Sequence, residues 1–141
     1  MEKFRKIQSN IAERIHNKVD ELGKKQPIYG SGYYDGRHFT TYVTDIERLK
    51  KADKLNESEK LLLELITATE AESATKGWGV APWYYEELAK IYRKKKEYSN
   101  EVSILERFAK QRHAPGVKPP KLLERLNKAR ELVATQSNTS D

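Results

Sequence analysis

The side chains best placed to do chemistry in this sequence are cations that share one predicted helix. Lys90, Arg93 and Lys94 are spaced by three and four residues, so they lie on one helical face. A row of cations held in this way attracts carboxylates, because it concentrates positive potential along a single surface. The chain of 141 residues carries 27 Lys and Arg against 21 Asp and Glu, a net charge of +6. Binding of an acidic ligand is therefore the first hypothesis.

The positive charge is concentrated in one part of the chain. Residues 85–130 contain thirteen basic and six acidic side chains, a local charge of +7. Residues 1–36 sum to +2, residues 37–84 to −1 and residues 131–141 to −2. Nucleic acid is a rival ligand for such a segment, and the sequence pI of about 9.4 permits it. No helix-turn-helix or zinc-finger pattern accompanies the charge, so a protein ligand is favoured.

Residues that could carry catalysis or hold a metal are scattered. His16, His38 and His113 form neither of the histidine spacings of helical zinc sites, and the chain contains no cysteine. His38 precedes Thr40 by two residues, a base close to a hydroxyl, but side chains so near in sequence rarely face each other. We expect His38 to have a surface or helix-capping role. No glycine pattern matches a phosphate-binding loop, and the sequence predicts no enzyme, metal site or cofactor.

Apolar residues recur with a helical period along most of the chain. The first stripe predicts an amphipathic helix over 2–22, ended by Gly23, and a connector rich in Gly and Tyr covers 24–38. This connector is either a short strand or a loop pinned by aromatic residues. Further helices are predicted over 39–52, from Asn56 to 76, from Pro82 to 96, from about Ser99 to 112, and over 120–134. The tail 135–141 is polar and predicted to fray.

Two of these helix boundaries have specific signals. Asn56 and Glu59 have the spacing of a capping box at a helix N-terminus. Gly77 is placed to end the same helix, and Pro82 suits the first turn of the next one.

The chain contains an internal repeat. A shift of 43 residues aligns two helix pairs, with Tyr42 on Tyr85, Leu62 on Leu105 and Leu65 on Phe108. A shift of 38 aligns the last helix with the helix that follows Pro82. Apolar phase, turn position and length agree, which predicts two antiparallel helix pairs and a closing helix, a short α-solenoid.

The residues Tyr85-x-x-Leu88-Ala89-x-x-Tyr92, followed by Tyr98 and Leu105, resemble the tetratricopeptide repeat, and the chain is similar to poorly characterised bacterial proteins with such repeats. The resemblance covers about 39–133. It departs at Glu101 and Phe108, which stand where that family has small residues, and in its spacing of 43. We expect the helices to be spaced differently as a result.

The resemblance implies that partners bind in a groove lined by the first helix of each pair. The cations that it places there are Lys50, Lys51, Lys90, Arg93, Lys94 and Lys128, interspersed with Glu47, Glu86 and Glu124. The lysines lack the asparagines that accompany them in carboxylate-gripping members of the family. Trp83 and Tyr85 are expected in the core. Trp78, between two glycines, and Tyr84, off the main stripe, are candidates for an aromatic lip.

We therefore predict an all-α fold with the domains 1–23, 24–38, 39–134 and 135–141. The predicted function is a non-catalytic module that binds an acidic peptide or protein surface, and the alternative is nucleic-acid binding by the basic face of residues 85–130. The stripe of 2–22 either caps the repeats or pairs in a homodimer. No membrane span or secretory signal is legible, which predicts a cytoplasmic protein.

Overall fold

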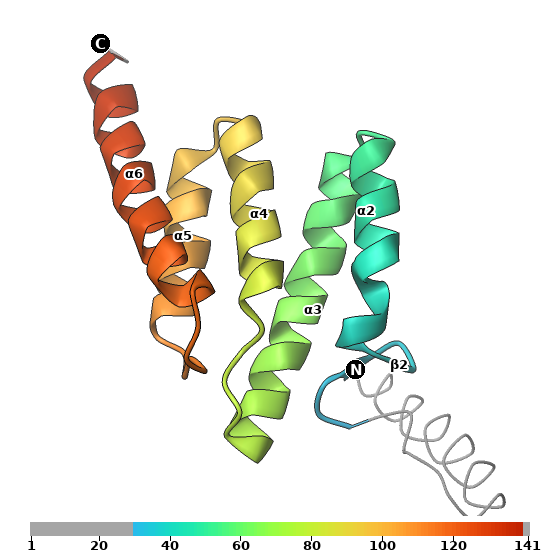
Figure 1. Cartoon of the computed structure of the whole chain (residues 1–141). Helices are drawn as coiled ribbons and strands as arrows, with labels where there is room; N and C mark the ends of the chain where they lie inside the picture. The colour runs from blue at the N-terminus through green and yellow to red at the C-terminus, as the bar shows by residue number, and fades with distance from the viewer. Residues whose placement is uncertain (1–29, 140–141) are drawn as a thin grey trace, which may run out of the picture.

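The structure, a computed structural model, describes residues 30–139, and helices dominate it. This part contains the α-helices α2 (Val43–Lys51), α3 (Leu55–Lys76), α4 (Pro82–Lys94), α5 (Tyr98–Ala109) and α6 (Lys118–Thr139). Each helix packs on the next one along the chain, and α4 also contacts α6. The helices alternate in direction along the row (Figure 1). The all-α fold class is confirmed, whereas the predicted helix 2–22 lies outside the described residues.

A small hairpin precedes the helices. The strands β1 (Tyr33–Tyr34) and β2 (Arg37–His38) are antiparallel, with Tyr33 opposite His38. The turn between them is Asp35-Gly36, and both residues have positive φ, as a tight two-residue hairpin requires. The Tyr42 hydroxyl donates a hydrogen bond of 2.7 Å to the carbonyl oxygen of Tyr34. The part of the connector that is described is thus a short strand pair held by an aromatic residue.

The first helical segment begins with a turn of 3-10 helix, η1 (Phe39–Tyr42), and continues as α2. Its start at Phe39 agrees with the predicted helix 39–52. His38 is the N-cap residue of η1, and its ring accepts a hydrogen bond from the Thr40 backbone N–H. The helix-capping role expected for His38 is confirmed.

The turn that joins α2 to α3 recurs 43 residues later between α4 and α5. Asp53 has a φ of 59° and Lys96 a φ of 60°. The backbone N–H groups of Lys54 and Glu97 donate to the carbonyl oxygens of Leu49 and Tyr92, again 43 residues apart. Burial repeats as well, since Leu62 and Leu105 are both fully buried, as are Leu65 and Phe108. The internal repeat seen in the sequence is therefore present in the backbone.

The predicted capping box at Asn56 and Glu59 is wrong. Helix α3 begins earlier, at Leu55, and its N-cap residue Lys54 makes no side-chain hydrogen bond. The two side chains are used for contacts between helices instead: the amide oxygen of Asn56 accepts from Lys95 Nζ at 2.8 Å, and Glu59 accepts from the Tyr92 hydroxyl at 2.9 Å. Distant partners at the C-terminal end of α4, Tyr92 and the C-cap residue Lys95, take the place of the local cap.

The other boundaries follow the sequence more closely. Gly77 ends α3 in the left-handed conformation with φ 74°, and Pro82 opens α4, both as predicted. Helix α6 is longer than predicted, because Pro119 and Pro120 are tolerated in its first turn and nothing in residues 135–139 breaks it. The helix predicted over 120–134 thus continues to Thr139.

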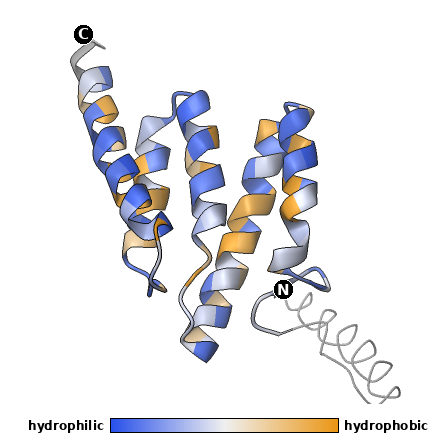
Figure 2. Cartoon of the chain, in the orientation of Figure 1, coloured by the Kyte–Doolittle hydropathy of each residue, from blue (hydrophilic) through white to orange (hydrophobic). Residues whose placement is uncertain are grey.

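The core lies between the helices along the length of the row. Helix α3 supplies its apolar middle (Figure 2), where Leu62, Leu65 and Ile66 are fully buried. Tyr85 of α4 and Phe108 of α5 pack with ring centroids 5.0 Å apart, and both are also fully buried. Tyr85 is thus in the core, as expected. Within the described residues, none of the helices is both long and apolar enough to cross a membrane.

Gly79 offers a test of how the loop before α4 is fastened. The Val80 backbone N–H donates to the carbonyl oxygen of Arg112 at 3.0 Å, so this loop lies against the one after α5. A Cβ at Gly79 would lie 2.7 Å from the backbone nitrogen of Ala114, whereas one at Gly77 would meet no atom within 4 Å. Both glycines have positive φ.

We predict that Gly77→Ala lowers the free energy of unfolding by about 1 kcal/mol, through backbone strain alone. Gly79→Ala should lower it by roughly 2–4 kcal/mol, because backbone atoms must also move apart. Urea unfolding followed by circular dichroism measures both values. Equal losses in the two variants would show that the two loops are not packed together.

Candidate functional site

A groove opens between α2 and α4. Its volume is about 530 Å³, and its lining residues are Glu47, Lys50, Lys51, Trp83 and Glu87. Three of these, Glu47, Lys50 and Lys51, belong to the positions that the family resemblance assigns to a ligand groove. The structure thus brings part of the predicted site together in a real depression.

Trp83 forms the apolar part of this groove. Its ring packs edge-to-face on Tyr84 at 4.9 Å, and Tyr84 packs edge-to-face on Phe39 at 5.4 Å. The indole is only partly buried against the core, so one part of it faces the depression. An aromatic surface held rigidly beside lysines can receive an apolar side chain next to an acidic one.

Glu87 pairs with Lys50 of the groove and with Lys90, which is not among the lining residues. This carboxylate is only 7% exposed, accepts a hydrogen bond from Lys50 Nζ, and lies 3.6 Å from Lys90 Nζ. Lys51 is exposed, and no ion pair to it occurs in the described part of the chain. Lys50, Lys51 and Lys90 against Glu47 and Glu87 leave a local charge of +1, a weaker field than the sequence alone indicates.

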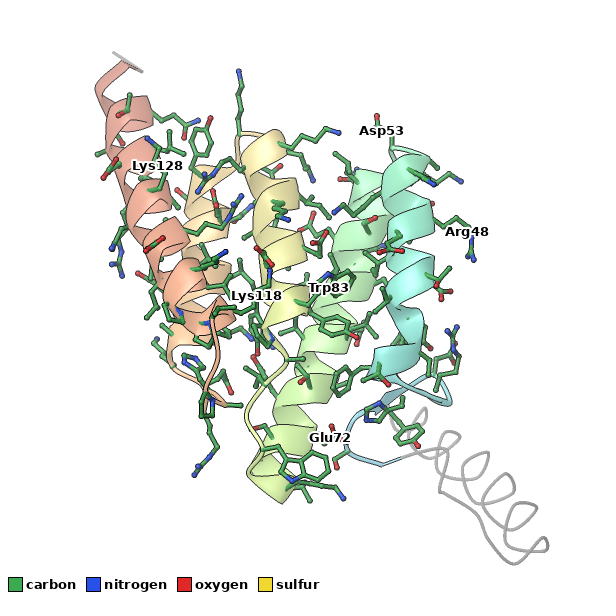
Figure 3. All side chains as sticks on the ribbon, in the orientation of Figure 1. Arg48, Asp53, Glu72, Trp83, Lys118 and Lys128 are labelled. Carbon is green, nitrogen blue, oxygen red and sulfur yellow. The ribbon has the colours of Figure 1, made fainter. Side chains whose placement is uncertain are left out.

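The remaining predicted cations do not line this groove. Arg93 turns toward α5 and pairs with Glu101, while Lys94 Nζ lies 3.5 Å from Asp53 in an exposed and hence weak pair. Lys128 lies on α6, at the other end of the row from α2 (Figure 3), 3.7 Å from Glu131. The six cations are thus distributed over four places.

Acidic residues of α3 neutralise much of the basic segment. Arg107 donates two hydrogen bonds of 2.8 Å to Glu70, and Lys95 Nζ lies 3.2 Å from Glu59. Both carboxylates belong to residues 37–84, far from their partners in sequence. The local charge of +7 counted along the chain is therefore partly cancelled once the helices pack.

Glu101 is a functional candidate of a different kind, because it is a fully buried carboxylate. Arg93 of α4 donates from Nε to its Oε1 at 2.9 Å, and Arg93 Nη2 lies 2.7 Å from Oε2. Arg125 Nε of α6 lies 2.9 Å from the same Oε2, although the angle is unsuited to a hydrogen bond. The sequence flagged Glu101 only as too large for its place in the repeat, and Arg125 was not predicted at all.

The two lip candidates have different outcomes. Tyr84 is 3% exposed, and its hydroxyl donates to the carbonyl oxygen of Phe39 at 3.0 Å. Its place at a lip is wrong, because the ring is enclosed between Trp83 and Phe39. Trp78 is 63% exposed with Lys76 Nζ 5.2 Å from its ring centroid. Trp78 follows the C-terminal end of α3, whereas Lys51 of the groove precedes the N-terminal end of the same helix. The 22 residues of α3, a length of about 33 Å, therefore separate Trp78 from Lys51.

His38 does face its neighbouring hydroxyl, contrary to expectation. Its Nδ1 lies 2.8 Å from Thr40 Oγ1, and its Nε2 lies 2.8 Å from Glu72 Oε2. Because Nδ1 also accepts from the Thr40 backbone N–H, the proton belongs on Nε2 and is donated to Glu72. The contact joins the hairpin to α3. No cluster of three potential metal ligands occurs among residues 30–139.

Comparisons with known proteins find no relative. No family model matches the chain, and neither a curated protein nor a solved structure does.

The burial of Tyr84 predicts an alkaline instability. Burial raises the pKa of its hydroxyl to about 12, above the usual 10. Below pH 10 the Tyr84 hydroxyl is neutral in both the folded and the unfolded chain. Between pH 10 and about 12 only the unfolded chain ionises easily, so the free energy of unfolding falls as the pH rises through this range. The loss amounts to roughly 2 kcal/mol.

Tyr84→Phe should therefore cost about 1 kcal/mol at pH 8, through the lost hydrogen bond. At pH 11.5 the variant should be at least as stable as the wild type, as measured by urea unfolding at the two pH values. Tyr33→Phe in the hairpin is the control, because its ring lies outside the buried core. If Tyr84→Phe costs as much at pH 11.5 as at pH 8, the hydroxyl is not buried.

Proposed function

We propose that the chain is a non-catalytic interaction module that binds an acidic segment of a protein partner in the groove between α2 and α4. The observation that carries the proposal is the placing of Lys50, Lys51 and the partly buried Trp83 around one depression. A peptide with an acidic residue next to an apolar one complements this combination of charge and aromatic surface.

The pairing of the lysines indicates how such a ligand would bind. Lys50 and Lys90 share Glu87, and a partner's carboxylate would approach cations that are already positioned by that glutamate. Preorganised side chains lose less conformational entropy on binding than free ones do. The exposed Lys51 would contribute to the rate of encounter, because charges at the rim of an interface act mainly on association.

The finer architecture that we propose is a short α-solenoid similar to tetratricopeptide repeats, with α2–α3 and α4–α5 as the two pairs and α6 as the closing helix. The recurrence of turn geometry and burial at 43 residues supports this arrangement. In such a scaffold α2, α4 and α6 are equivalent elements that share one face, on which the groove lies.

Nucleic-acid binding receives less support. A phosphate backbone needs a continuous run of free cations, but Lys95 and Arg107 pair with carboxylates of α3, and Arg130 lies 3.1 Å from Glu106.

The groove is tested by reversing its charge. We predict that Lys50→Glu/Lys51→Glu weakens binding of a short leucine-containing acidic peptide by about tenfold or more, because like charges then oppose the ligand. Lys60→Glu is the matched control, an exposed lysine of α3 that does not line the groove.

Fluorescence of Trp83 can report this binding. The chain has two tryptophans, so Trp78→Phe leaves Trp83 as the sole indole. The emission should shift on addition of the peptide and should not shift in the Lys50→Glu/Lys51→Glu variant. An unchanged emission, or equal peptide affinity in all variants, would remove the groove as the binding site.

Salt dependence separates the two ligand classes. We expect peptide binding to persist at moderate salt and binding of a duplex DNA of mixed sequence to be weak throughout. A duplex that binds tightly at about 50 mM salt and is lost by about 200 mM would favour the nucleic-acid alternative instead.

A further inference from the structure

Cations outnumber carboxylates where α4 meets α6. Six charged groups lie close enough there to act on one another, and four of them are basic. They are Glu86, Lys90 and Arg93 of α4, Glu101 of α5, and Lys118 and Arg125 of α6. Four positive and two negative charges leave +2, but Lys90 also pairs with Glu87 of the groove, so the charge that belongs to the cluster alone is +1. We call this set the α4–α6 cation cluster.

The buried carboxylate of this cluster serves two guanidinium groups at once. Arg93 and Arg125 both approach Oε2 of Glu101, at 2.7 Å and 2.9 Å. One carboxylate neutralises only one of them, so the pair retains a positive charge. Arg93 and Arg125 remain 29% and 21% exposed, so a ligand can reach them from the surface.

The second carboxylate is also outnumbered. Lys118 Nζ donates to Glu86 Oε1 at 2.5 Å, between α4 and the start of α6 (Figure 3). Burial would raise the pKa of Glu86, but this hydrogen bond and the charges of Lys90, Lys118 and Arg125 hold the pKa below its usual value. Burial and the charge of Arg93 lower the pKa of Arg125. The cations around Glu86 thus outweigh the effect of its burial.

Arg125 has donors to spare. Its Nε lies 2.9 Å from Glu101 Oε2 without a hydrogen bond, and in the described part of the chain no hydrogen bond engages its two terminal amino groups. A guanidinium with free terminal donors is suited to bidentate binding of an oxyanion. By contrast the charge of Arg107 is matched by a carboxylate of its own, because Glu70 takes two of its donors, and Thr67 takes a third.

We propose that the α4–α6 cation cluster binds the phosphate group of a phosphorylated side chain on the acidic partner. A phosphate monoester carries a charge of about −1.5 to −2 at neutral pH and three acceptor oxygens, so the surplus positive charge and the free donors of Arg125 attract it more strongly than a single carboxylate. The inference rests on the proposed function for its source of phosphate. Lys90 connects the two sites, because it lies 3.6 Å from Glu87 of the groove and also acts on Glu86 of the cluster.

The test uses the full chain and two synthetic acidic peptides that differ only in carrying serine or phosphoserine. In isothermal titration calorimetry, the phosphoserine peptide should bind about tenfold more tightly than the serine peptide. This gain in affinity is the effect of one or two charge-assisted hydrogen bonds. The gain should disappear in Arg125→Gln, which keeps the one-to-one pair of Arg93 with Glu101. It should persist in Arg107→Gln, the matched control that removes an arginine without surplus charge nearby.

Glu101→Gln should change the gain from phosphoserine in the opposite direction to Arg125→Gln, because it leaves the guanidinium groups of Arg93 and Arg125 without their carboxylate. The gain from phosphoserine should increase at least threefold in this variant. Equal affinity of the two peptides for the wild type, or a gain that survives in Arg125→Gln, would overturn the proposal. Failure of the groove proposal shows separately, as unchanged binding of the serine peptide to Lys50→Glu/Lys51→Glu.

Thermal unfolding with inorganic phosphate is a second measurement that can be made on the wild type, so the test does not depend on variants that fold poorly. Phosphate should raise the melting temperature of the wild type more than sodium chloride of equal ionic strength does, since a ligand stabilises the state it binds. The same rise is expected for Arg107→Gln and a larger one for Glu101→Gln. Identical melting temperatures in the two salts for the wild type would also overturn the proposal.

Discussion

The burial of one carboxylate between two arginines sets the arrangement of the second half of the molecule. Glu101 belongs to α5, Arg93 to α4 and Arg125 to α6, so a single buried charge involves three helices. An unpaired carboxylate in such a place would cost several kcal/mol, and the cost is avoided only when the helices bring the cations to it. The corresponding residue of the first pair, 43 positions earlier, is the buried Ser58, which needs no such partner. The two helix pairs have the same turn geometry, but only the second pair needs cations to neutralise a buried carboxylate.

Ion pairs between helices also reduce the positive charge that is left for a ligand. Lys95, just after α4, and Arg107 of α5 pair with Glu59 and Glu70 of α3, whose negative charge lies in another part of the sequence. What remains is a small surplus in two places, the groove beside Trp83 and the α4–α6 cation cluster. Localised surpluses of this kind select ligands by shape and position, whereas an evenly basic surface would attract any polyanion.

Much of the fold follows from local signals, and the site follows from them only in part. The apolar period, Gly77 and Pro82 predict the helices because backbone rules act over a few residues. Glu87 and its partner Lys50 lie 37 residues apart, so no local pattern reveals that this lysine is already paired. Asn56 failed as a cap and Tyr84 as a surface residue for the same reason, since contacts with distant residues decided both. Glu101 was noticeable in the sequence only as a charged residue at a position where the resemblance to tetratricopeptide repeats implies a small one.

The packing of each helix on its neighbour in sequence has a consequence for how the chain folds. Contacts between successive helices require only short loops to close, and such topologies fold on timescales of about microseconds to milliseconds. A helix pair can form before the rest, and the next elements can add to it in order. The exception is the contact of α4 with α6, which spans α5 and brings Arg125 to its place. We therefore expect the cation cluster to be completed last, after the helices of both pairs have docked.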